Sequence, residues 1–122
     1  MKRILVVDDD PGIRESLTMA FESMCEVLTT GSIATGLGII EATAVDLVIL
    51  DYHFPDGRGD DALRSIKKRW PWLPVIVITA SGTESLGAHL RWLGAHTCFP
   101  KPYDVPTLQN AVKQCLDLPT EK

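Results

Sequence analysis

The sequence ILVVDD at residues 4–9 decides how the rest of the chain is interpreted, because an unbroken apolar run ends abruptly in two acids. Two further runs of the same kind follow, Leu47 to Leu50 and Val75 to Ile78. Short β-branched runs without polar alternation are typical of strands that are covered on both faces, as in a parallel sheet. Less apolar segments at Glu26 to Thr30 and Thr97 to Phe99 complete five predicted strands, and their composition suits the sheet edges.

Between these strands the apolar residues recur at the spacing of helices. Asp10 and Asp104 each stand shortly before a proline, a pattern typical of a helix cap and its first turn. Strand and helix alternate five times, which predicts a three-layer α/β domain with helices on both faces of a parallel sheet. The domain is expected to cover residues 1–118, with a frayed tail at 119–122. The predicted helical stripes are Ile13, Leu17, Ala20, Phe21 and Met24; Ile33, Leu37 and Ile40; Leu63 and Ile66; Leu86, Leu90 and Leu93; and Leu108, Ala111, Val112 and Cys115.

Length and composition exclude several classes of protein. With 122 residues, 45% hydrophobic and 23% charged, the chain is expected to form one domain with a substantial core. A net charge of −4 argues against a nucleic-acid-binding surface, and no apolar segment is long enough to cross a bilayer or to act as a signal peptide. Cys25, Cys98 and Cys115 form no close pair, which favours small, buried free thiols in a cytoplasmic protein.

Polar side chains follow four of the predicted strands, at the sheet edge where ligands bind in open parallel sheets. Asp8 and Asp9 follow the first strand and Asp51 ends the third. If these two strands are neighbours, the carboxylates converge and repel one another, and a hard divalent cation such as Mg²⁺ relieves that repulsion. Thr79 after the fourth strand and Lys101 after the fifth would then stand opposite the metal. The pattern therefore predicts a cradle for a phosphoryl group.

These motifs resemble the receiver domain of two-component response regulators, and the resemblance covers essentially the whole chain. It implies a flavodoxin-like, doubly wound sheet of five parallel strands in the order 2-1-3-4-5, with helices on both faces. The segments that carry it are ILVVDD at 4–9, DLVILD at 46–51 followed by Pro55 and Gly59, VIVITA at 75–80, and Gly94-Ala95 running to Lys101-Pro102.

The resemblance implies a role for each acid. Asp51 matches the phosphoacceptor of the family. Asp8 and Asp9 match the acidic pair that holds Mg²⁺, and the backbone carbonyl of His53 falls where the family supplies a further metal ligand. The His53 side chain has two interpretations: it influences the water that removes the phosphoryl group, or it is an ordinary solvent-facing loop histidine.

The resemblance also implies how a signal leaves the site. Lys101 matches the lysine that pairs with the phosphoryl group, Thr79 matches the switch hydroxyl, and the small Ala80 leaves room beside it. The family usually has Tyr or Phe three residues before the lysine, where this chain has Cys98. We interpret Cys98 as a core-filling residue, with a redox-sensing thiol as the alternative.

The implied function is a signalling module that catalyses its own Mg²⁺-dependent phosphorylation and dephosphorylation, rather than an enzyme with a separate substrate. Its partners would be a sensor histidine kinase or phosphotransfer protein, and an effector at the face formed by residues 86–112; neither nucleic acid nor membrane is expected. The alternatives are a haloacid-dehalogenase-type phosphatase that uses Asp8 as nucleophile, a flavodoxin-like binder of flavin mononucleotide, and a pseudo-receiver. The chain could be a stand-alone receiver or the front of a longer regulator.

Two further predictions concern the packing of the tryptophans. Trp92 lies off the apolar stripe of its helix and is expected to pack locally, with a role as an interface anchor as the alternative. Trp70 and Trp72 are expected to close the end of the core far from the site.

Overall fold

The structure, a computed structural model, describes residues 1–54, 57–80 and 84–118. The main-sheet strands are β1 (Arg3–Val7), β2 (Glu26–Thr30), β3 (Leu47–Asp51), β6 (Val75–Thr79) and β7 (Thr97–Pro100). A separate short hairpin is formed by β4 (His53–Phe54) and β5 (Gly57–Arg58). The helices are α1 (Pro11–Phe21), α2 (Ile33–Ala42), α3 (Gly59–Arg69), α4 (Glu84–Trp92) and α5 (Val105–Cys115).

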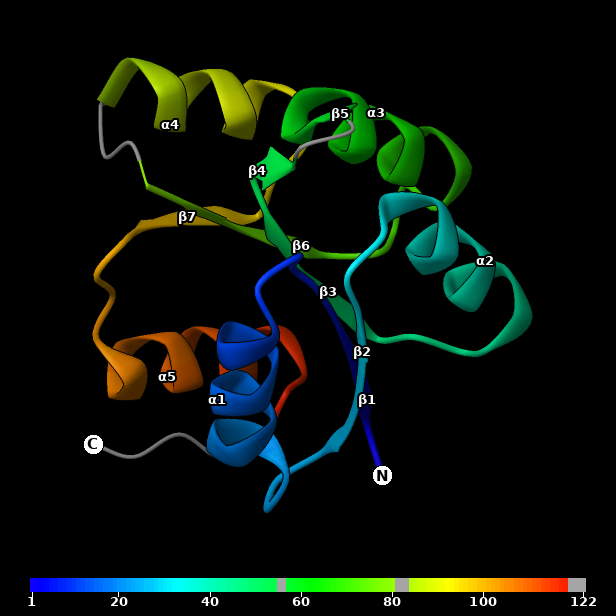
Figure 1. Ribbon diagram of the computed structural model, residues 1–122, viewed down its shortest axis with the longest axis vertical. Helices are drawn as coiled ribbons and strands as arrows, with labels where there is room; N and C mark the ends of the chain where they lie inside the picture. The colour runs from blue at the N-terminus through cyan, green and yellow to red at the C-terminus, as the bar shows by residue number, and fades with distance from the viewer. Residues whose placement is uncertain (55–56, 81–83, 119–122) are drawn as a thin grey trace.

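The five main strands form one parallel sheet in the order β2-β1-β3-β6-β7. Counted within this sheet alone, that is the order 2-1-3-4-5, so the predicted flavodoxin-like topology is confirmed. Helices α1 and α5 cover one face of the sheet, and α2, α3 and α4 cover the other (Figure 1). In the described ranges, no helix combines the length and the apolarity that a bilayer crossing requires.

The central strands carry unbroken apolar runs, at residues 4–7, 47–50 and 75–78, because both of their faces are buried. In β1, Ile4 and Val6 belong to the core on the α1 and α5 side, whereas Leu5 and Val7 belong to the core on the other side. All four are at most 2% exposed. Full burial of such a side chain contributes about 1.5–3 kcal/mol, so each central strand binds the two helical layers together. The edge strand β2 has no fully buried residue, as its weaker hydrophobicity predicts.

The predicted helix starts are also present. The side chain of Asp10 accepts a hydrogen bond from the Gly12 amide at 2.8 Å, and that of Asp104 accepts from the Thr107 amide at 3.0 Å. Both are N-caps with a proline in the first turn. These caps start α1 and α5 directly beyond the strand ends that carry the polar residues.

Several sequence-based expectations need correction. The β4–β5 hairpin was not predicted. Trp72 is 67% exposed, so of the two tryptophans only the half-buried Trp70 helps to close the core. Trp92 is 81% exposed, and its predicted local packing is wrong. Cys25 is buried as expected, but the other two cysteines are only half-buried. Pro55 and the tail at 119–122 lie outside the described residues.

The connection from β3 into α3 turns tightly at Gly59. Its amide donates a hydrogen bond to the Tyr52 carbonyl at 2.9 Å. A Cβ atom at Gly59 would lie 2.7 Å from that carbonyl oxygen and 2.8 Å from the Tyr52 Cα. The absence of a side chain therefore lets α3 begin directly against the residue that follows Asp51.

We expect Gly59→Ala to lower the free energy of unfolding by about 1–3 kcal/mol, because the new methyl group overlaps backbone atoms that cannot move aside. Gly38→Ala in α2 is the matched control, since nothing lies within 4 Å of its Cβ position. That substitution is expected to raise the free energy of unfolding by up to about 1 kcal/mol through helix propensity. Urea denaturation measures both, and equal effects of the two variants would contradict the close approach at Gly59.

Candidate functional site

Three acids meet at the carboxyl ends of β1 and β3. Val7 pairs with Leu50 across these strands, which places Asp8 beside Asp51. One carboxylate oxygen from each of Asp8, Asp9 and Asp51 lies within 4.8 Å of the other two. Asp8 is 2% exposed and Asp51 is 4% exposed, while Asp9 faces solvent. The structure thus brings together the acids that the sequence placed at one sheet edge.

The environment of Asp8 disfavours its charged form. Burial raises the pKa of Asp8 to about 6, the largest effect, and the negative charges of Asp51 and Asp9 add to it. A hydrogen bond from the Asp10 amide, 2.9 Å from Asp8 Oδ1, and the positive charge of Lys101 act in the opposite direction. The cluster therefore carries a repulsion that its own residues do not cancel, which is the chemistry of a site for a hard cation.

Thr79 and Lys101 reach the same edge from the other half of the sheet. Thr79 pairs with Pro100, and the Lys101 amide donates to the Thr79 carbonyl at 2.7 Å. The Lys101 ammonium lies 3.6 Å from Asp51 Oδ1. A cation thus faces the acids across a gap, and Thr79, which is 3% exposed, ends the strand between them. The predicted joint placement is present.

His53 contacts both Asp51 and Thr79. Its amide donates to Asp51 Oδ1 at 3.5 Å, a long contact, and its Nε2 lies 3.4 Å from Thr79 Oγ1. The side chain is exposed, but it also contacts the hydroxyl that the sequence singled out as a switch. Ala80, the next residue after Thr79, is exposed and small.

Cys98 lies in β7 opposite Val77, with β6 between it and the strand that ends in Asp51, and packs against the core on the α4 side of the sheet. Burial raises the pKa of its thiol, and Arg91 only partly opposes this effect. A redox-sensing thiol needs a lowered pKa and access to solvent. The environment of Cys98 therefore favours the core-filling interpretation.

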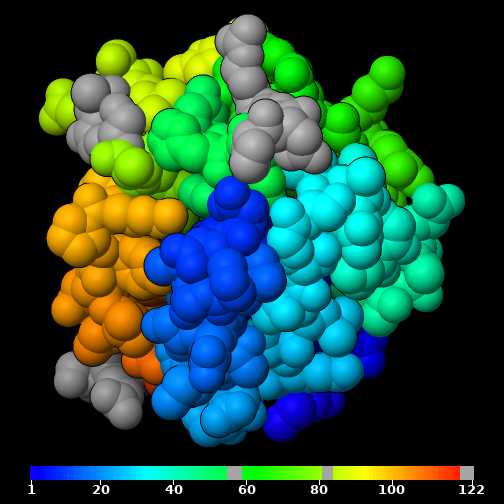
Figure 2. Space-filling view, in the orientation of Figure 1, coloured from blue at the N-terminus to red at the C-terminus, as the bar shows by residue number. Residues whose placement is uncertain are grey.

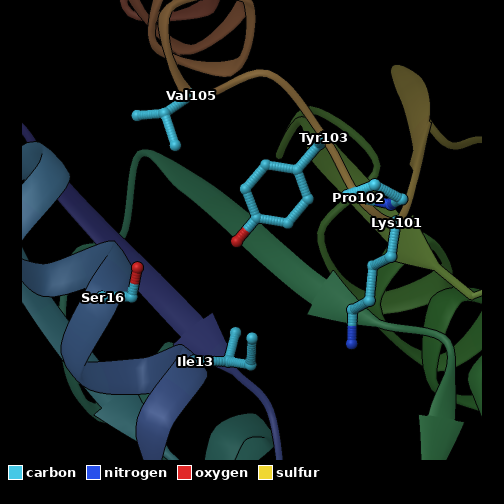
Figure 3. Close-up of a pocket in the computed structure, with 6 residues that line it drawn as sticks. All are labelled: Ile13, Ser16, Lys101, Pro102, Tyr103 and Val105. Carbon is cyan, nitrogen blue, oxygen red and sulfur yellow. The ribbon is translucent and has the colours of Figure 1, made fainter.

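A hollow of about 490 Å³ adjoins Lys101, between α1 and the connection from β7 to α5. Tyr103 extends across it towards α1, with its hydroxyl facing Ile13 and Ser16 (Figure 3). Burial raises the pKa of Tyr103, and the charge of Asp8 adds to the effect. The sequence analysis missed Tyr103, whose one signal is an aromatic side chain just after Lys101-Pro102. The lining residues are Ile13, Ser16, Lys101, Pro102, Tyr103 and Val105.

Residues 4–113 match the sequence model of the response regulator receiver domain. The chain belongs to this family. The receiver domain is 39% identical to the DNA-binding transcriptional regulator NtrC of Bradyrhizobium sp. over 120 residues, which is 98% of this chain and 25% of that protein. It is 36% identical to sporulation initiation phosphotransferase F of Bacillus subtilis over 120 residues, which is 96% of this chain and 95% of that protein.

Solved structures agree with the assignment. A response regulator receiver domain protein of Clostridium thermocellum superposes with a TM-score of 0.88 at 32% identity, covering 96% of this chain and 95% of that one. A CheY-like receiver domain protein of Methanospirillum hungatei gives a TM-score of 0.89 at 30% identity, covering 96% and 94%. Receiver domains are signalling modules of two-component systems, so the phosphatase and flavin-binding alternatives are set aside. The chain spans about a quarter of the length of the NtrC relatives it matches.

We expect Asp8→Asn to stabilise the metal-free receiver domain. The native pKa of Asp8 lies above its ordinary value, so the native state holds this proton more tightly than the unfolded state does, and stability falls as pH rises from about 4 to about 6. An amide carries no such cost, and the gain at about pH 8 is on the order of 1–3 kcal/mol, or a few degrees in Tm.

The measurement is thermal unfolding of the variant and the parent in chelator, at about pH 4 and about pH 8. The gain is expected at the higher pH only. Asp61→Asn, at an exposed acid of α3 outside the site, is the control and is expected to leave the difference unchanged. A loss of stability in Asp8→Asn at about pH 8 would show that the acidic cluster is not under strain.

Proposed function

We propose that the chain accepts a phosphoryl group on Asp51 from a phosphohistidine of a sensor histidine kinase or phosphotransfer protein. The observation that carries the proposal is the placement of buried Asp51 between two acids, within 4.8 Å, and the Lys101 ammonium, at 3.6 Å. The Asp51 carboxylate thus has two acids on one side, which could hold a metal ion with it, and a lysine ammonium on the other. In phosphoryl transfer, positioning and charge stabilisation supply most of the catalysis.

The acids fit Mg²⁺ by their chemistry, since three carboxylates converge and burial already raises the pKa of one of them. Asp8, Asp9 and Asp51 would hold the ion together with the backbone carbonyl of His53. When bound, the metal supplies positive charge that offsets the charge on the transferred oxygens. We include Mg²⁺ in the proposal as the cofactor of this site.

In the transfer itself, a carboxylate oxygen of Asp51 forms a bond to phosphorus while the phosphorus–nitrogen bond to the donor imidazole breaks. The imidazole leaves with the bonding electron pair. Lys101 stabilises the charge on the phosphoryl oxygens from the side opposite the acids. In dephosphorylation, a water oxygen would form a bond to phosphorus in the same cradle while the bond from phosphorus to the Asp51 oxygen breaks, which releases inorganic phosphate and restores the carboxylate. The domain would therefore catalyse both its own phosphorylation and its own dephosphorylation.

The new phosphoryl group would carry a charge of roughly −1.5 to −2 and three acceptor oxygens, by analogy with other phosphorylated side chains. The Thr79 hydroxyl and the Ala80 amide would donate to it, which requires Thr79 to leave its contact with His53. The movement would pass to α4 and to the face formed by residues 86–112, where Trp92 is exposed as an anchor for an effector. Because Cys98 stands where the family usually has Tyr or Phe, an aromatic ring cannot relay the signal here. The signal would instead pass through the main chain that follows Thr79.

We take residues 1–118 as the extent of this phosphoaccepting domain. The matched relatives include long regulators, of which the chain covers about a quarter, and a protein of about the same length. The effector that a phosphorylated domain would act on is therefore also left to the proposal.

Asp51→Asn is expected to abolish Mg²⁺-dependent labelling by a small acyl phosphate such as acetyl phosphate, because the amide is a poor nucleophile. Intact-protein mass spectrometry measures the added phosphoryl mass with and without chelator. Asp61→Asn is the control and is expected to label like the parent. Persistent labelling of Asp51→Asn would refute the assignment, and a label on Asp8 would point to the phosphatase chemistry instead.

Lys101→Ala is expected to uncouple phosphorylation from the conformational response, since the ammonium is the cation that the phosphoryl oxygens would approach. The measurement is the change in amide NMR shifts of α4 when beryllofluoride is added with Mg²⁺. Lys68→Ala, at an exposed lysine of α3, is the control and is expected to respond like the parent. An undiminished response in Lys101→Ala would contradict this role.

A further inference from the structure

Arg14 of α1 holds the backbone between the two adjacent acids. Its Nη1 donates a hydrogen bond to the Asp8 carbonyl at 2.7 Å. The donor is charged, and such hydrogen bonds are short and roughly twice as strong as neutral ones. The Asp8 amide donates to the Thr30 carbonyl of β2 at 3.0 Å. The main chain at Asp8 is thus fixed on its amide side by the sheet and on its carbonyl side by Arg14.

The fixed carbonyl belongs to the peptide unit that joins Asp8 to Asp9. Because a peptide unit is planar, the direction of its carbonyl also sets the direction of the Asp9 amide and Cα. The Asp8 side chain is held separately by the Asp10 amide, at 2.9 Å from Oδ1. Arg14 therefore determines how the exposed Asp9 carboxylate is presented relative to the buried one.

The space that Arg14 occupies exists because residue 31 is glycine. A Cβ atom on Gly31 would lie 2.8 Å from Arg14 Nη1 and 3.5 Å from its Cζ. The backbone of Gly31 does not lie in the left-handed region, so an alanine meets no conformational strain there and the only obstacle is the guanidinium. Figure 2 shows the surface of α1, in blue, lying against the cyan residues that connect β2 to α2.

The geometry points to Arg14 as a positioning residue for Mg²⁺: we propose that it clamps the Asp8–Asp9 peptide in the orientation the ion needs, and that Gly31 provides the room. This inference rests on the Mg²⁺ site proposed above and adds two residues to it. Mg²⁺ tolerates little departure from octahedral geometry, so the mutual direction of its carboxylates sets its affinity. The contact that Arg14 makes here is with the Asp8 backbone carbonyl, so its effect on the carboxylates is exerted through the main chain.

The test is a double-mutant cycle on Mg²⁺ affinity, measured by isothermal titration calorimetry of the unphosphorylated chain. Arg14→Ala is expected to weaken binding by about 10–100-fold, the usual effect of losing a partner of a metal ligand. Gly31→Ala is expected to weaken it as well, because the methyl group displaces the guanidinium while the charge remains. The double variant is expected to bind no more weakly than Arg14→Ala alone, since without the guanidinium the methyl group makes only an ordinary contact with the Asp8 carbonyl oxygen, at 3.7 Å.

Three further measurements separate positioning from general stability. Arg14→Lys, which keeps one donor, is expected to recover part of the affinity, and Gly38→Ala is expected to have none of these effects. The phosphorylation rate of Arg14→Ala is expected to reach half of its own maximum at a higher Mg²⁺ concentration than that of the parent, whereas Gly38→Ala is expected to follow the parent. In metal-free protein, ¹⁵N relaxation is expected to show greater motion of the Asp9 amide in Arg14→Ala and Gly31→Ala.

The outcomes that overturn the inference are distinct from those that overturn the proposed function. If the parent binds no Mg²⁺, the proposed site itself is wrong. If the parent binds and Arg14→Ala binds within about twofold of it, Arg14 has no positioning role. If the two substitutions are additive, Gly31 acts by a route that does not involve the guanidinium. Should Arg14→Ala fail to fold, Gly31→Ala and Arg14→Lys still decide the matter.

Discussion

Asp8 and Asp51 stand side by side at the ends of β1 and β3, and both are almost fully buried. Like charges in such a place disfavour one another, and the Lys101 ammonium, 3.6 Å from Asp51 Oδ1, offsets the repulsion only in part, since the pKa of Asp8 stays raised. The parallel sheet enforces this conflict, because the apolar runs of β1 and β3 are anchored in both cores and end at the same edge. The raised pKa of Asp8 follows from this enforced burial and from the neighbouring negative charges.

The features that the sequence could predict follow from the sheet. Burial on both faces leaves an unbroken apolar run, so residues 4–7, 47–50 and 75–78 were recognisable as strands, and parallel strands bring their exits to one edge. The β4–β5 hairpin has strands of two residues, too short for any periodicity. The exposure of Trp72 depends on the direction of a turn. The pairing of Arg14 with Gly31 joins residues from different elements, and neither has a local pattern that indicates the other.

Polar side chains connect Tyr52, the residue directly after Asp51, with α4. Asp60, in the first turn of α3, lies beside the tight approach of Gly59 to Tyr52. Burial raises the pKa of Asp60, but hydrogen bonds from Tyr52 and His89, together with the charges of His89 and Arg64, outweigh it and lower the pKa overall. His89 Nε2 of α4 is 2.9 Å from Asp60 Oδ2. Tyr52, next to Asp51, and His89, in α4, therefore both interact with the Asp60 carboxylate.

The helices differ in how many side chains anchor them to the sheet. On one side α1 and α5 bury Leu17, Phe21, Leu108 and Val112, whereas α4 buries Leu90 alone among its described residues. At about 1.5–3 kcal/mol for each buried side chain, moving α1 or α5 alone would cost about twice as much as a displacement of α4. A new charge on Asp51 can bias a two-state element only by a few kcal/mol. If Asp51 accepts a phosphoryl group as proposed, this difference in burial favours a response at α4, while α1, which carries Arg14, would keep the acids of the proposed metal site in place.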